Sequence, residues 1–291
     1  MHQIALLTAT YNHPKELMKL FDSLEKQSDK NFTWVIINDG SEEETENVLQ
    51  IINNNSIIDV KVINKGNGGK SSSINMGFDC LETNVEFVLI IDDDERLKPE
   101  AVMTVKEYVE KYRNSDCGVI HFNRTNEKGD IIANPIIRED FYMNFQVFKS
   151  ERRYADGYLG YFVKALGKNR FTIYPGEKYI APSTLIMKVN RKSKLLWAGT
   201  VLGETEYLVG GITKQGRKLR VKNPMGMIEY CELMMENGAT FLTKLSYSTQ
   251  GYAYRVIARG KAQKTEKAPN LIRVCALPGA ILSLIWKCKY L

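Results

Sequence analysis

The sequence predicts an α/β fold with a mostly parallel central sheet flanked by helices and a helical extension at the carboxyl end. Two observations favour this class. Short apolar, β-branched runs alternate with helical patterns over the first hundred residues, and a polar cluster follows each run. Strands that alternate with helices form crossover units, and such units place the strands parallel. With 291 residues, 44% of them hydrophobic, the chain can form one large core.

The first hundred residues contain four predicted strands and three predicted helices. Pro14 suits the first turn of a helix because the N–H that it lacks is not needed there. Ser41, followed by three glutamates, predicts the start of a second helix. The last apolar run is continuous, so we expect a strand buried on both faces. The predicted strands are 4–8, 33–37, 60–63 and 87–91, and the third helix is 71–81.

The second half of the chain has less regular patterns. Strand-like runs and helical patterns still alternate there, without an internal repeat. Asn223-Pro224 predicts a helix start, and Pro182 predicts that another helix starts near Ala181. The expected strands are 119–122 and runs within 197–209, the expected turn is 128–130, and the expected helices are 157–166, 177–189 and 223–236.

Polar clusters follow the four predicted strands of the first hundred residues. In open parallel sheets, ligands bind outside the carboxyl ends of the strands. We therefore expect these clusters to converge on one edge and to form a ligand cleft. The clusters are Thr10-Tyr11-Asn12, Asp39-Gly40-Ser41, Asn67-Gly68-Gly69-Lys70 and Asp92-Asp93-Asp94.

The acidic cluster carries the strongest chemical signal. Like charges this close repel one another, and a divalent cation such as Mg²⁺ or Mn²⁺ relieves the repulsion. Residues i and i+2 of an extended segment share a face, so Asp92 and Asp94 are the predicted metal ligands and Asp93 points away. A solvated acidic loop is the alternative for such a triplet alone. The buried strand before it and the three other polar loops favour the metal site.

Three further signals are weaker. The glycines before Lys70 let the backbone approach a ligand, and the lysine can neutralise a phosphate, although a plain turn has the same pattern. Asp39 can accept a hydrogen bond from a base edge or a ribose hydroxyl, or it can cap a helix. Glu177 can act as a general base towards an acceptor hydroxyl, or it can be an exposed glutamate at a helix start.

Charge and cysteine content narrow the function classes. The net charge of +6 suits an anionic ligand, a nucleic acid or an anionic membrane surface. Lysine and arginine do not cluster with aromatic residues, so we expect no nucleic-acid role. The five cysteines form no CxxC pair, and we see no secretory signal. We therefore expect reduced thiols in a cytoplasmic protein.

The segment 271–291 is apolar, contains a Pro-Gly break and carries lysines near its end. It is too interrupted to span a bilayer. An interfacial helix is expected, with Trp286 and the lysines at the lipid headgroups and with Lys261, Lys264 and Lys267 upstream assisting. The alternative is that this helix packs on the rest of the chain or on a second subunit.

The order of these motifs resembles the GT-A glycosyltransferases of family 2, whose fold is Rossmann-like. The family opens with a strand and a T-x-Y-N-type turn, continues with an amphipathic helix and a strand-D-G-S element, and then has N-x-G and acidic motifs. The resemblance covers residues 4–102 in order and spacing. The matching positions are Thr8–Asn12, Leu17, Ser23, Leu24, Gln27, Val35–Ser41, Asn67–Lys70, Asn75, Gly77, Asp92–Glu95 and Pro99.

Two positions depart from the family pattern. Glu95 stands where the family often has Asp, and Lys178 replaces the second acid of a later E-D element. The resemblance therefore assigns the catalytic base to Glu177. A looser similarity links the chain to a bacterial subset associated with surface polysaccharide assembly. It rests on 176–179, Glu206-Tyr207, 210–213 and Asn223-Pro224.

The resemblance implies an inverting transfer of a sugar from a nucleotide donor, expected to be a UDP-sugar. The acceptor is expected to be a hydroxyl of a glycan or lipid-linked acceptor in cell-surface polysaccharide or capsule biosynthesis. Mn²⁺ or Mg²⁺ would bridge the diphosphate. The implied donor-binding residues are Thr10, Tyr11, Asn12, Asp39, Asn67, Gly69, Lys70, Asn75, Asp92 and Asp93, with Asp92 and Asp94 on the metal and Glu177 as the base.

The resemblance also implies a domain plan. We expect a catalytic domain over 1–240, with a nucleotide-sugar-binding half over 1–100 and an acceptor-binding half over 101–240, and a helical tail over 241–291. Peripheral contact with the inner face of the cell membrane and a homodimer are both compatible with this plan. A nucleotidyltransferase is one alternative, but it would show a Gly-rich basic loop where Thr10–Pro14 stands. A catalytically inactive nucleotide-sugar-binding module is the other, because Lys178 replaces an acid.

Overall fold

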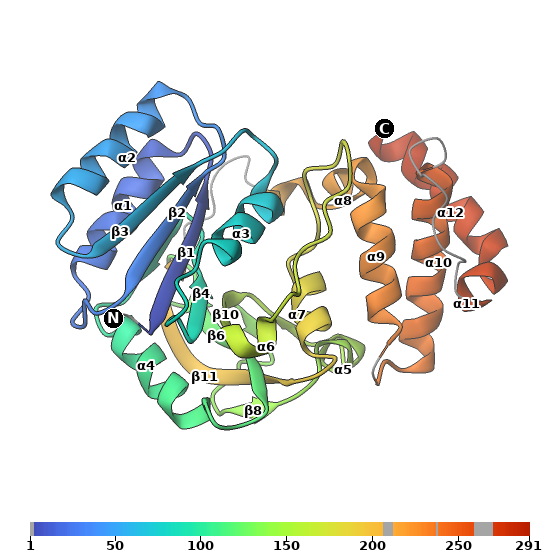
Figure 1. Ribbon diagram of the computed structural model, residues 1–291. Helices are drawn as coiled ribbons and strands as arrows, with labels where there is room; N and C mark the ends of the chain where they lie inside the picture. The colour runs from blue at the N-terminus through green and yellow to red at the C-terminus, as the bar shows by residue number, and fades with distance from the viewer. Residues whose placement is uncertain (1–2, 206–211, 237, 259–269) are drawn as a thin grey trace. The chain divides into compact units, whose positions relative to one another are not determined.

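The computed structural model describes residues 3–205, 212–236, 238–258 and 270–291, which form two compact units (Figure 1). The first unit comprises the described residues of Met1–Met143, Arg153–Asn169 and Lys192–Leu208. The second comprises those of Asn144–Arg152, Arg170–Arg191 and Val209–Leu291. The sequence matches at Glu206, Tyr207, Gly210 and Gly211 and the upstream lysines Lys261, Lys264 and Lys267 lie outside the described residues.

The first unit is built on one large mixed sheet. Its first half is parallel throughout, as the alternation of strands and helices predicts. The sheet changes direction at β10, which runs antiparallel to both of its neighbours, β4 and β6. The strand order is β3 (Asp59–Asn64), β2 (Thr33–Asn38), β1 (Ile4–Thr10), β4 (Phe87–Ile90), β10 (Gly157–Phe162), β6 (Cys117–Thr125), β11 (Lys194–Thr205) and β5 (Glu95–Leu97), with β8 (Phe141–Tyr142) also on β11.

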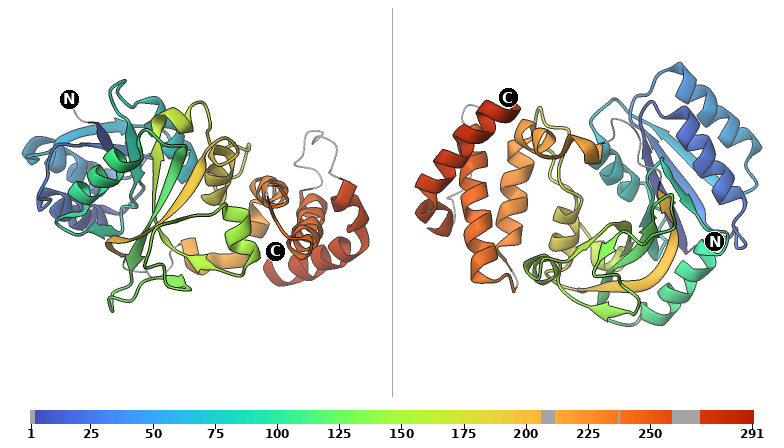
Figure 2. Two further views of the ribbon diagram at one scale, coloured as in Figure 1. Left: turned by 90° about the horizontal axis from the view of Figure 1, so that it is seen from below. Right: turned by 180° about the vertical axis from the view of Figure 1, so that it is seen from behind.

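Helices cover both faces of this sheet (Figures 1 and 2). Alternate strand residues such as Leu6 and Trp34 share a buried cluster with side chains of α1, α2 and α4. On the opposite face α3 packs against β1 so closely that a Cβ atom on Gly77 would lie 2.2 Å from Leu7 Cδ1. The helices are α1 (Pro14–Glu25), α2 (Glu43–Asn55), α3 (Lys70–Asp79), α4 (Ala101–Tyr112) and α6 (Val163–Leu166).

The predicted elements of the first hundred residues are confirmed to within a few residues. Pro14 opens α1 as expected. Helix α2 begins at Glu43 rather than at Ser41, because the Ser41 hydroxyl accepts a hydrogen bond from the backbone N–H of Asn12 instead of capping α2. Strand β4 is buried as expected, with Phe87, Val88 and Leu89 inaccessible to solvent.

Two predictions in the second half were wrong. The expected helix 157–166 is strand β10 followed by the short helix α6. The two glycines and three aromatic residues of β10 disfavour a helix, and the glycines allow close contact with Phe87 and with the Phe122 carbonyl. The expected helix 177–189 begins only at Ser183, after Pro182. A small two-stranded sheet, β7 (Ala133–Asn134) with β9 (Tyr154–Ala155), lies apart from the main one.

The second unit is helical, which confirms the predicted carboxyl-terminal helical extension. Helix α10 packs against both α9 and α12, and its Tyr254 ring lies 4.8 Å from the ring of Trp286. Among the described residues, no helix has both the length and the apolar character needed to cross a membrane. The helices are α5 (Phe145–Ser150), α7 (Ser183–Val189), α8 (Ile212–Lys222), α9 (Pro224–Met234), α10 (Phe241–Ile257), α11 (Asn270–Val274) and α12 (Ala276–Tyr290).

Candidate active site

The carboxyl ends of β1, β2 and β4 meet at one edge of the sheet. Thr10 and Asn38 are register partners at the ends of β1 and β2. The backbone N–H of Asp39 donates to the Thr10 carbonyl at 2.9 Å, so the loop after β2 continues beside β1. Asp92 follows β4, which pairs with the other side of β1. The sheet therefore brings together the polar clusters that the sequence predicts at this edge.

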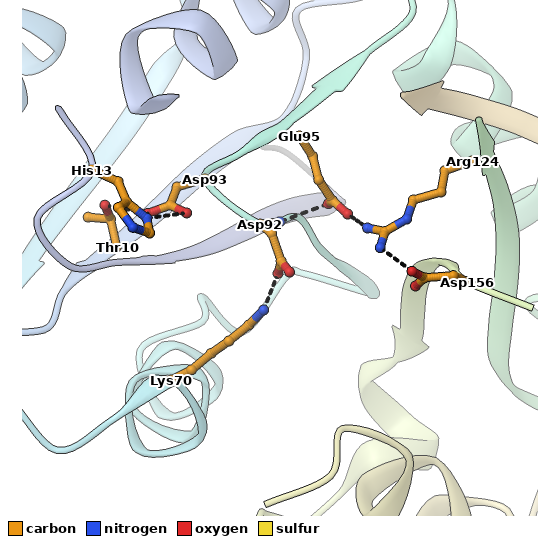
Figure 3. A network of polar contacts seen from close by, with 8 residues as sticks. All are labelled: Thr10, His13, Lys70, Asp92, Asp93, Glu95, Arg124 and Asp156. Carbon is orange, nitrogen blue, oxygen red and sulfur yellow. Dashed lines mark hydrogen bonds and ion pairs between the residues drawn. The ribbon is translucent and has the colours of Figure 1, made fainter. Parts of the chain in front are cut away.

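Asp92 forms an ion pair with Lys70, the first residue of α3 (Figure 3). The Lys70 Nζ atom lies 2.5 Å from Asp92 Oδ1, and the two side chains are 38% and 33% exposed. Burial alone would raise the pKa of Asp92, but the charge and hydrogen bond of Lys70 lower it below its ordinary value. The pair is accessible enough for Lys70 to turn towards an anionic ligand.

Asp94 lies beside two other carboxylates and forms no ion pair of this kind with any residue in the described ranges. Burial, followed by the negative charges of Asp92 and Asp93, raises the pKa of Asp94 to about 6. A divalent cation would relieve this repulsion, so the residues fit the implied metal. No three potential His, Cys, Asp or Glu ligands converge within the described part of the chain. This donor set suits Mg²⁺ or Mn²⁺, which can take one or two carboxylates and complete their coordination with phosphate and water.

Asp93 points away from Asp92, towards β1 and the start of α1 (Figure 3). The Thr10 hydroxyl donates to Asp93 Oδ2 at 2.7 Å, and the His13 Nδ1 atom lies 3.2 Å from both carboxylate oxygens. The hydrogen bond to Asp93 raises the pKa of His13. Thr10 and Asp93 are both buried, and they hold the acidic loop against the end of β1. Their predicted contact with the donor stays a prediction.

Asp39 is buried and holds the loop that precedes α3. Its carboxylate accepts hydrogen bonds from Lys65 Nζ at 2.5 Å and from the backbone N–H groups of Gly68 and Gly69 at 2.9 and 2.8 Å. Burial alone would raise its pKa, but these three contacts lower it overall. Gly40 has φ +74°, and a Cβ there would lie 2.8 Å from the Asn67 nitrogen, so the close approach needs glycine.

Sequence reasoning missed Lys65. The residue follows β3 at the same sheet edge as Asp39, and a charged residue directly after a strand is the signal that could have found it. The structure therefore pairs both lysines of this region with aspartates: Lys65 with Asp39, and Lys70 with Asp92.

The other predicted donor-binding residues lie on the same loops. Tyr11 is 47% exposed after β1. Asn12 has φ +54°, and its Oδ1 atom accepts a hydrogen bond from the Glu42 backbone at 2.7 Å, which joins the loops after β1 and β2. Asn67 lies in the loop before α3, and Asn75 lies within that helix.

Arg124 links the acidic loop to a distant part of the chain, and sequence reasoning missed it. One Glu95 carboxylate oxygen is bound by Arg124, and the other accepts a hydrogen bond from the Asp92 backbone N–H at 2.9 Å. Arg124 also contacts Asp156 at 2.5 Å (Figure 3). The longer Glu95, at the position where the resemblance expects Asp, thus spans from the Asp92 backbone to a buried arginine.

Glu177 belongs to the second unit, and its side chain contacts the first turn of α9. Its carboxylate oxygens accept hydrogen bonds from the backbone N–H groups of Met225 at 2.8 Å and Gly226 at 3.0 Å, and the residue is 8% exposed. Asn223 Oδ1 accepts from the backbone of Lys178 at 3.0 Å. These contacts give Glu177 a capping role at a helix N-terminus. Its role as the catalytic base stays a prediction.

The arrangement has a counterpart in a known protein family. The sequence profile described as Glycosyl transferase family 2 matches residues 6–170, which is more than half of the chain. The chain belongs to glycosyl transferase family 2. The matched span includes the Asp39, Lys70 and Asp92–Asp94 loops and ends before Glu177.

The curated proteins that match this chain are named as glycosyltransferases. The chain is 25% identical over 131 residues to the poly(ribitol-phosphate) β-N-acetylglucosaminyltransferase TarS of Staphylococcus aureus, a match that covers 44% of this chain and 22% of TarS. It is 27% identical over 142 residues to glycosyltransferase GlyA of Streptococcus pneumoniae, covering 48% and 20% of the two chains. The chain spans less than half the length of the curated relatives it matches.

Solved structures confirm the fold. The crystal structure of S. aureus TarS 1–349 in complex with UDP-GlcNAc has a TM-score of 0.66 at 14% identity, covering 96% of this chain and 79% of TarS 1–349. The mannosyltransferase PcManGT of Pyrobaculum calidifontis, in complex with GDP-Man and Mn²⁺, has a TM-score of 0.60 at 12% identity, covering 97% and 80%. The predicted GT-A fold is therefore confirmed.

Proposed function

We propose that this family 2 chain transfers a sugar from a UDP-sugar donor to a hydroxyl of a glycan or lipid-linked acceptor, with inversion, in cell-surface polysaccharide biosynthesis. One observation carries the proposal: Asp92 and Asp94 stand at the end of β4, with Lys70 ion-paired to Asp92 and the Asp39 loop leading directly into Lys70. Two carboxylates, a lysine and a glycine-lined loop at one sheet edge are the groups needed to hold a nucleoside diphosphate.

The choice of UDP rests on similarity. TarS, whose name describes an N-acetylglucosaminyltransferase, has been solved with UDP and with UDP-GlcNAc. PcManGT has been solved with GDP-Man, so the fold alone does not choose the nucleoside. The acceptor class rests on the same relatives, whose names include a poly(ribitol-phosphate) acceptor. The cytoplasmic location and the homodimer stay predictions.

Each site residue has its own proposed role in binding the donor or the cation. Asp94, with Asp92, would hold Mn²⁺ or Mg²⁺, and the bound cation would supply positive charge for the departing diphosphate. Lys70 would exchange its contact with Asp92 for one with a donor phosphate. Asp39 and Lys65 fix the loop before α3, so that its backbone can approach the nucleoside. The leaving group is a phosphate and needs no proton.

The acceptor hydroxyl must lose its proton to a base. Glu177 is the residue proposed for this step, because Lys178 stands where the family has a second acid. The two N–H contacts that Glu177 accepts at α9 explain its burial without catalysis.

The experiment compares Asp94→Asn with Glu127→Gln, an exposed acid on a turn. In the presence of Mn²⁺, UDP-sugars should raise the melting temperature of the unaltered protein by mass action, and turnover should release UDP. We expect Asp94→Asn to lower turnover by roughly a hundredfold or more, and Glu127→Gln to leave it unchanged. Full turnover in Asp94→Asn would overturn the proposal.

The same assay separates the two alternatives. A nucleotidyltransferase would release pyrophosphate instead of a nucleoside diphosphate. A catalytically inactive binding module would show the rise in melting temperature with UDP-sugars and no product with any acceptor.

A further inference from the structure

Helix α12 presents its long aliphatic side chains outwards. Its buried face against α10 consists of Gly279, Ser283 and Trp286. A helix of a soluble protein normally turns its apolar side chains inwards and its polar side chains outwards. In α12 Trp286 is buried, but the long aliphatic side chains face outwards, and at Gly279 the close packing on α10 leaves no room for a side chain, since a Cβ there would lie 2.7 Å from Tyr252.

The outward residues form a continuous row along α11 and α12. We call this row the apolar stripe: Val274, Leu277, Ile281, Leu284, Ile285 and Leu291. The first four follow one another at spacings of three or four positions, Ile285 is adjacent to Leu284, and Leu291 directly follows α12; at about 100° per residue they lie on one side, and their exposed fractions run from 53% to 77%. Contiguous exposed apolar surface of this kind marks an interaction site.

The start of α10 carries exposed apolar side chains of its own. Cys275 Sγ lies 4.0 Å from the Leu245 carbonyl, so α10 and α12 begin side by side (Figure 1). Phe241 and Leu242, one turn before Leu245, are 70% and 74% exposed. An open groove between the two helices, of about 470 Å³, is lined by Leu242, Leu245, Leu282 and Trp286 among others.

The charge of this region indicates what kind of partner covers the apolar stripe. Within residues 238–258 and 270–291, the described parts, there are five Lys or Arg and no Asp or Glu. Lys287 and Lys289 are exposed at the end of the apolar stripe, and Arg273 is exposed at its start. The basic residues are Lys244, Arg255, Arg273, Lys287 and Lys289, of which Arg255 is ion-paired with Glu232 of α9.

A second copy of the chain fits this surface poorly. In a two-fold dimer the same patch meets itself, so the basic residues of both copies would face one another without acids between them. An anionic lipid surface offers negative charge for the basic residues and an apolar layer for the aliphatic ones. We propose that the apolar stripe lies on an anionic phospholipid bilayer, with α12 parallel to the membrane plane and Lys287 and Lys289 at the headgroups.

This inference goes beyond the proposed function and does not depend on it. The test is flotation of the full chain with vesicles of phosphatidylcholine, alone or mixed in equal parts with phosphatidylglycerol. We expect binding to the mixed vesicles only, and weaker binding as salt is added. Replacing Leu277, Ile281 and Leu284 together with Ser should lower the bound fraction by about tenfold or more. Transfer to a soluble acceptor should not change.

The matched control replaces Ile57, Ile136 and Ile173 with Ser, three exposed isoleucines elsewhere on the chain. This variant should bind vesicles like the unaltered protein. A second variant, Lys287→Gln with Lys289→Gln, should lower binding by about tenfold, while Lys128→Gln with Lys192→Gln should not.

Three outcomes would overturn the proposal. The triple Ser variant could float with the mixed vesicles as well as the unaltered chain does. The chain could bind pure phosphatidylcholine equally well, which would show that anionic lipid is not needed for binding. Sedimentation without lipid could show a dimer that the triple variant dissociates, which would make a second copy the occupant of the stripe.

Discussion

The Lys70 ammonium and the Asp92 carboxylate lie 2.5 Å apart, so the first residue of α3 neutralises the first acid after β4. In the absence of a ligand the two groups satisfy one another. A donor diphosphate would compete for Lys70, and a cation would compete for Asp92. The ion pair therefore balances the charge of Asp92, whereas the charges of Asp93 and Asp94 still raise the pKa of Asp94.

Lys70→Gln removes the cation from this pair. We expect the KM for the donor to rise by roughly ten- to a hundredfold, because a charge-assisted contact to phosphate contributes about 1.5 to 3 kcal/mol. The melting temperature should change little, since the pair is partly exposed. Steady-state kinetics over a range of donor concentrations measure the effect, with Lys26→Gln, an exposed lysine on α1's carboxyl end, as the control. An unchanged donor KM would exclude a phosphate role for Lys70.

Arg124→Met leaves Glu95 buried without its cation. We expect the free energy of unfolding to fall by about 3 to 5 kcal/mol, because an uncompensated buried charge is costly. Adding Glu95→Leu should recover a large part of that loss, since both charges are then absent. Urea unfolding of the two single variants and the double variant gives the coupling energy. Simple additivity would mean that Glu95 and Arg124 do not stabilise one another.

Glu177→Gln separates capping from catalysis. The amide can no longer offer two charged oxygens to Met225 and Gly226. Because an amide cannot accept the acceptor proton, we expect kcat to fall by about a hundredfold or more, and the free energy of unfolding to fall by about 1 to 2 kcal/mol from the weakened capping contacts. Glu127→Gln is the control for loss of one acid. A loss of stability with full turnover below the melting transition would show that Glu177 only caps α9.

His121 gives the protein a pH-dependent stability. Burial lowers its pKa to about 4, while the unfolded chain keeps the ordinary value of 6.5. Between pH 6.5 and pH 4 the unfolded state binds a proton at His121 and the folded state does not. The contribution of neutral His121 to the free energy of unfolding is therefore present above pH 6.5 and is lost as the pH falls towards 4. The loss is at most about 3 kcal/mol.

His121→Phe keeps the ring contact with Trp197 and removes the titrating group. Unfolding free energies measured from pH 7 down to pH 4 should fall more steeply for the unaltered protein than for this variant, with the difference confined to the lower part of the range. Parallel profiles for the two proteins would show that His121 is not responsible.

The sequence predicts those parts of the site that lie directly after strands. Asp39 and Asp92–Asp94 could be found because apolar runs end where they begin, and parallel strands end at one edge. Lys65 directly follows β3 and could have been found in the same way, but its pairing with Asp39, 26 residues away, could not. Arg124 could not be assigned from a local pattern, since its acidic partners Glu95 and Asp156 are 29 and 32 residues away and are brought near by strand pairing. The resemblance gave Glu177 a catalytic role but could not predict its capping contacts, because the donating N–H groups belong to α9, more than forty residues later in the chain.

The direction of β10 has a consequence for dissecting the protein. Because β10 runs opposite to β4, its beginning lies beside the end of β4, and Leu159 pairs with Ile90. Asp156, directly before β10, is therefore placed beside Arg124 at the end of β6, and Arg124 binds Glu95 of the acidic loop. A fragment truncated near residue 100 would expose the edge of β4 and leave Glu95 without its guanidinium, so the amino-terminal half cannot serve as a minimal nucleotide-binding module.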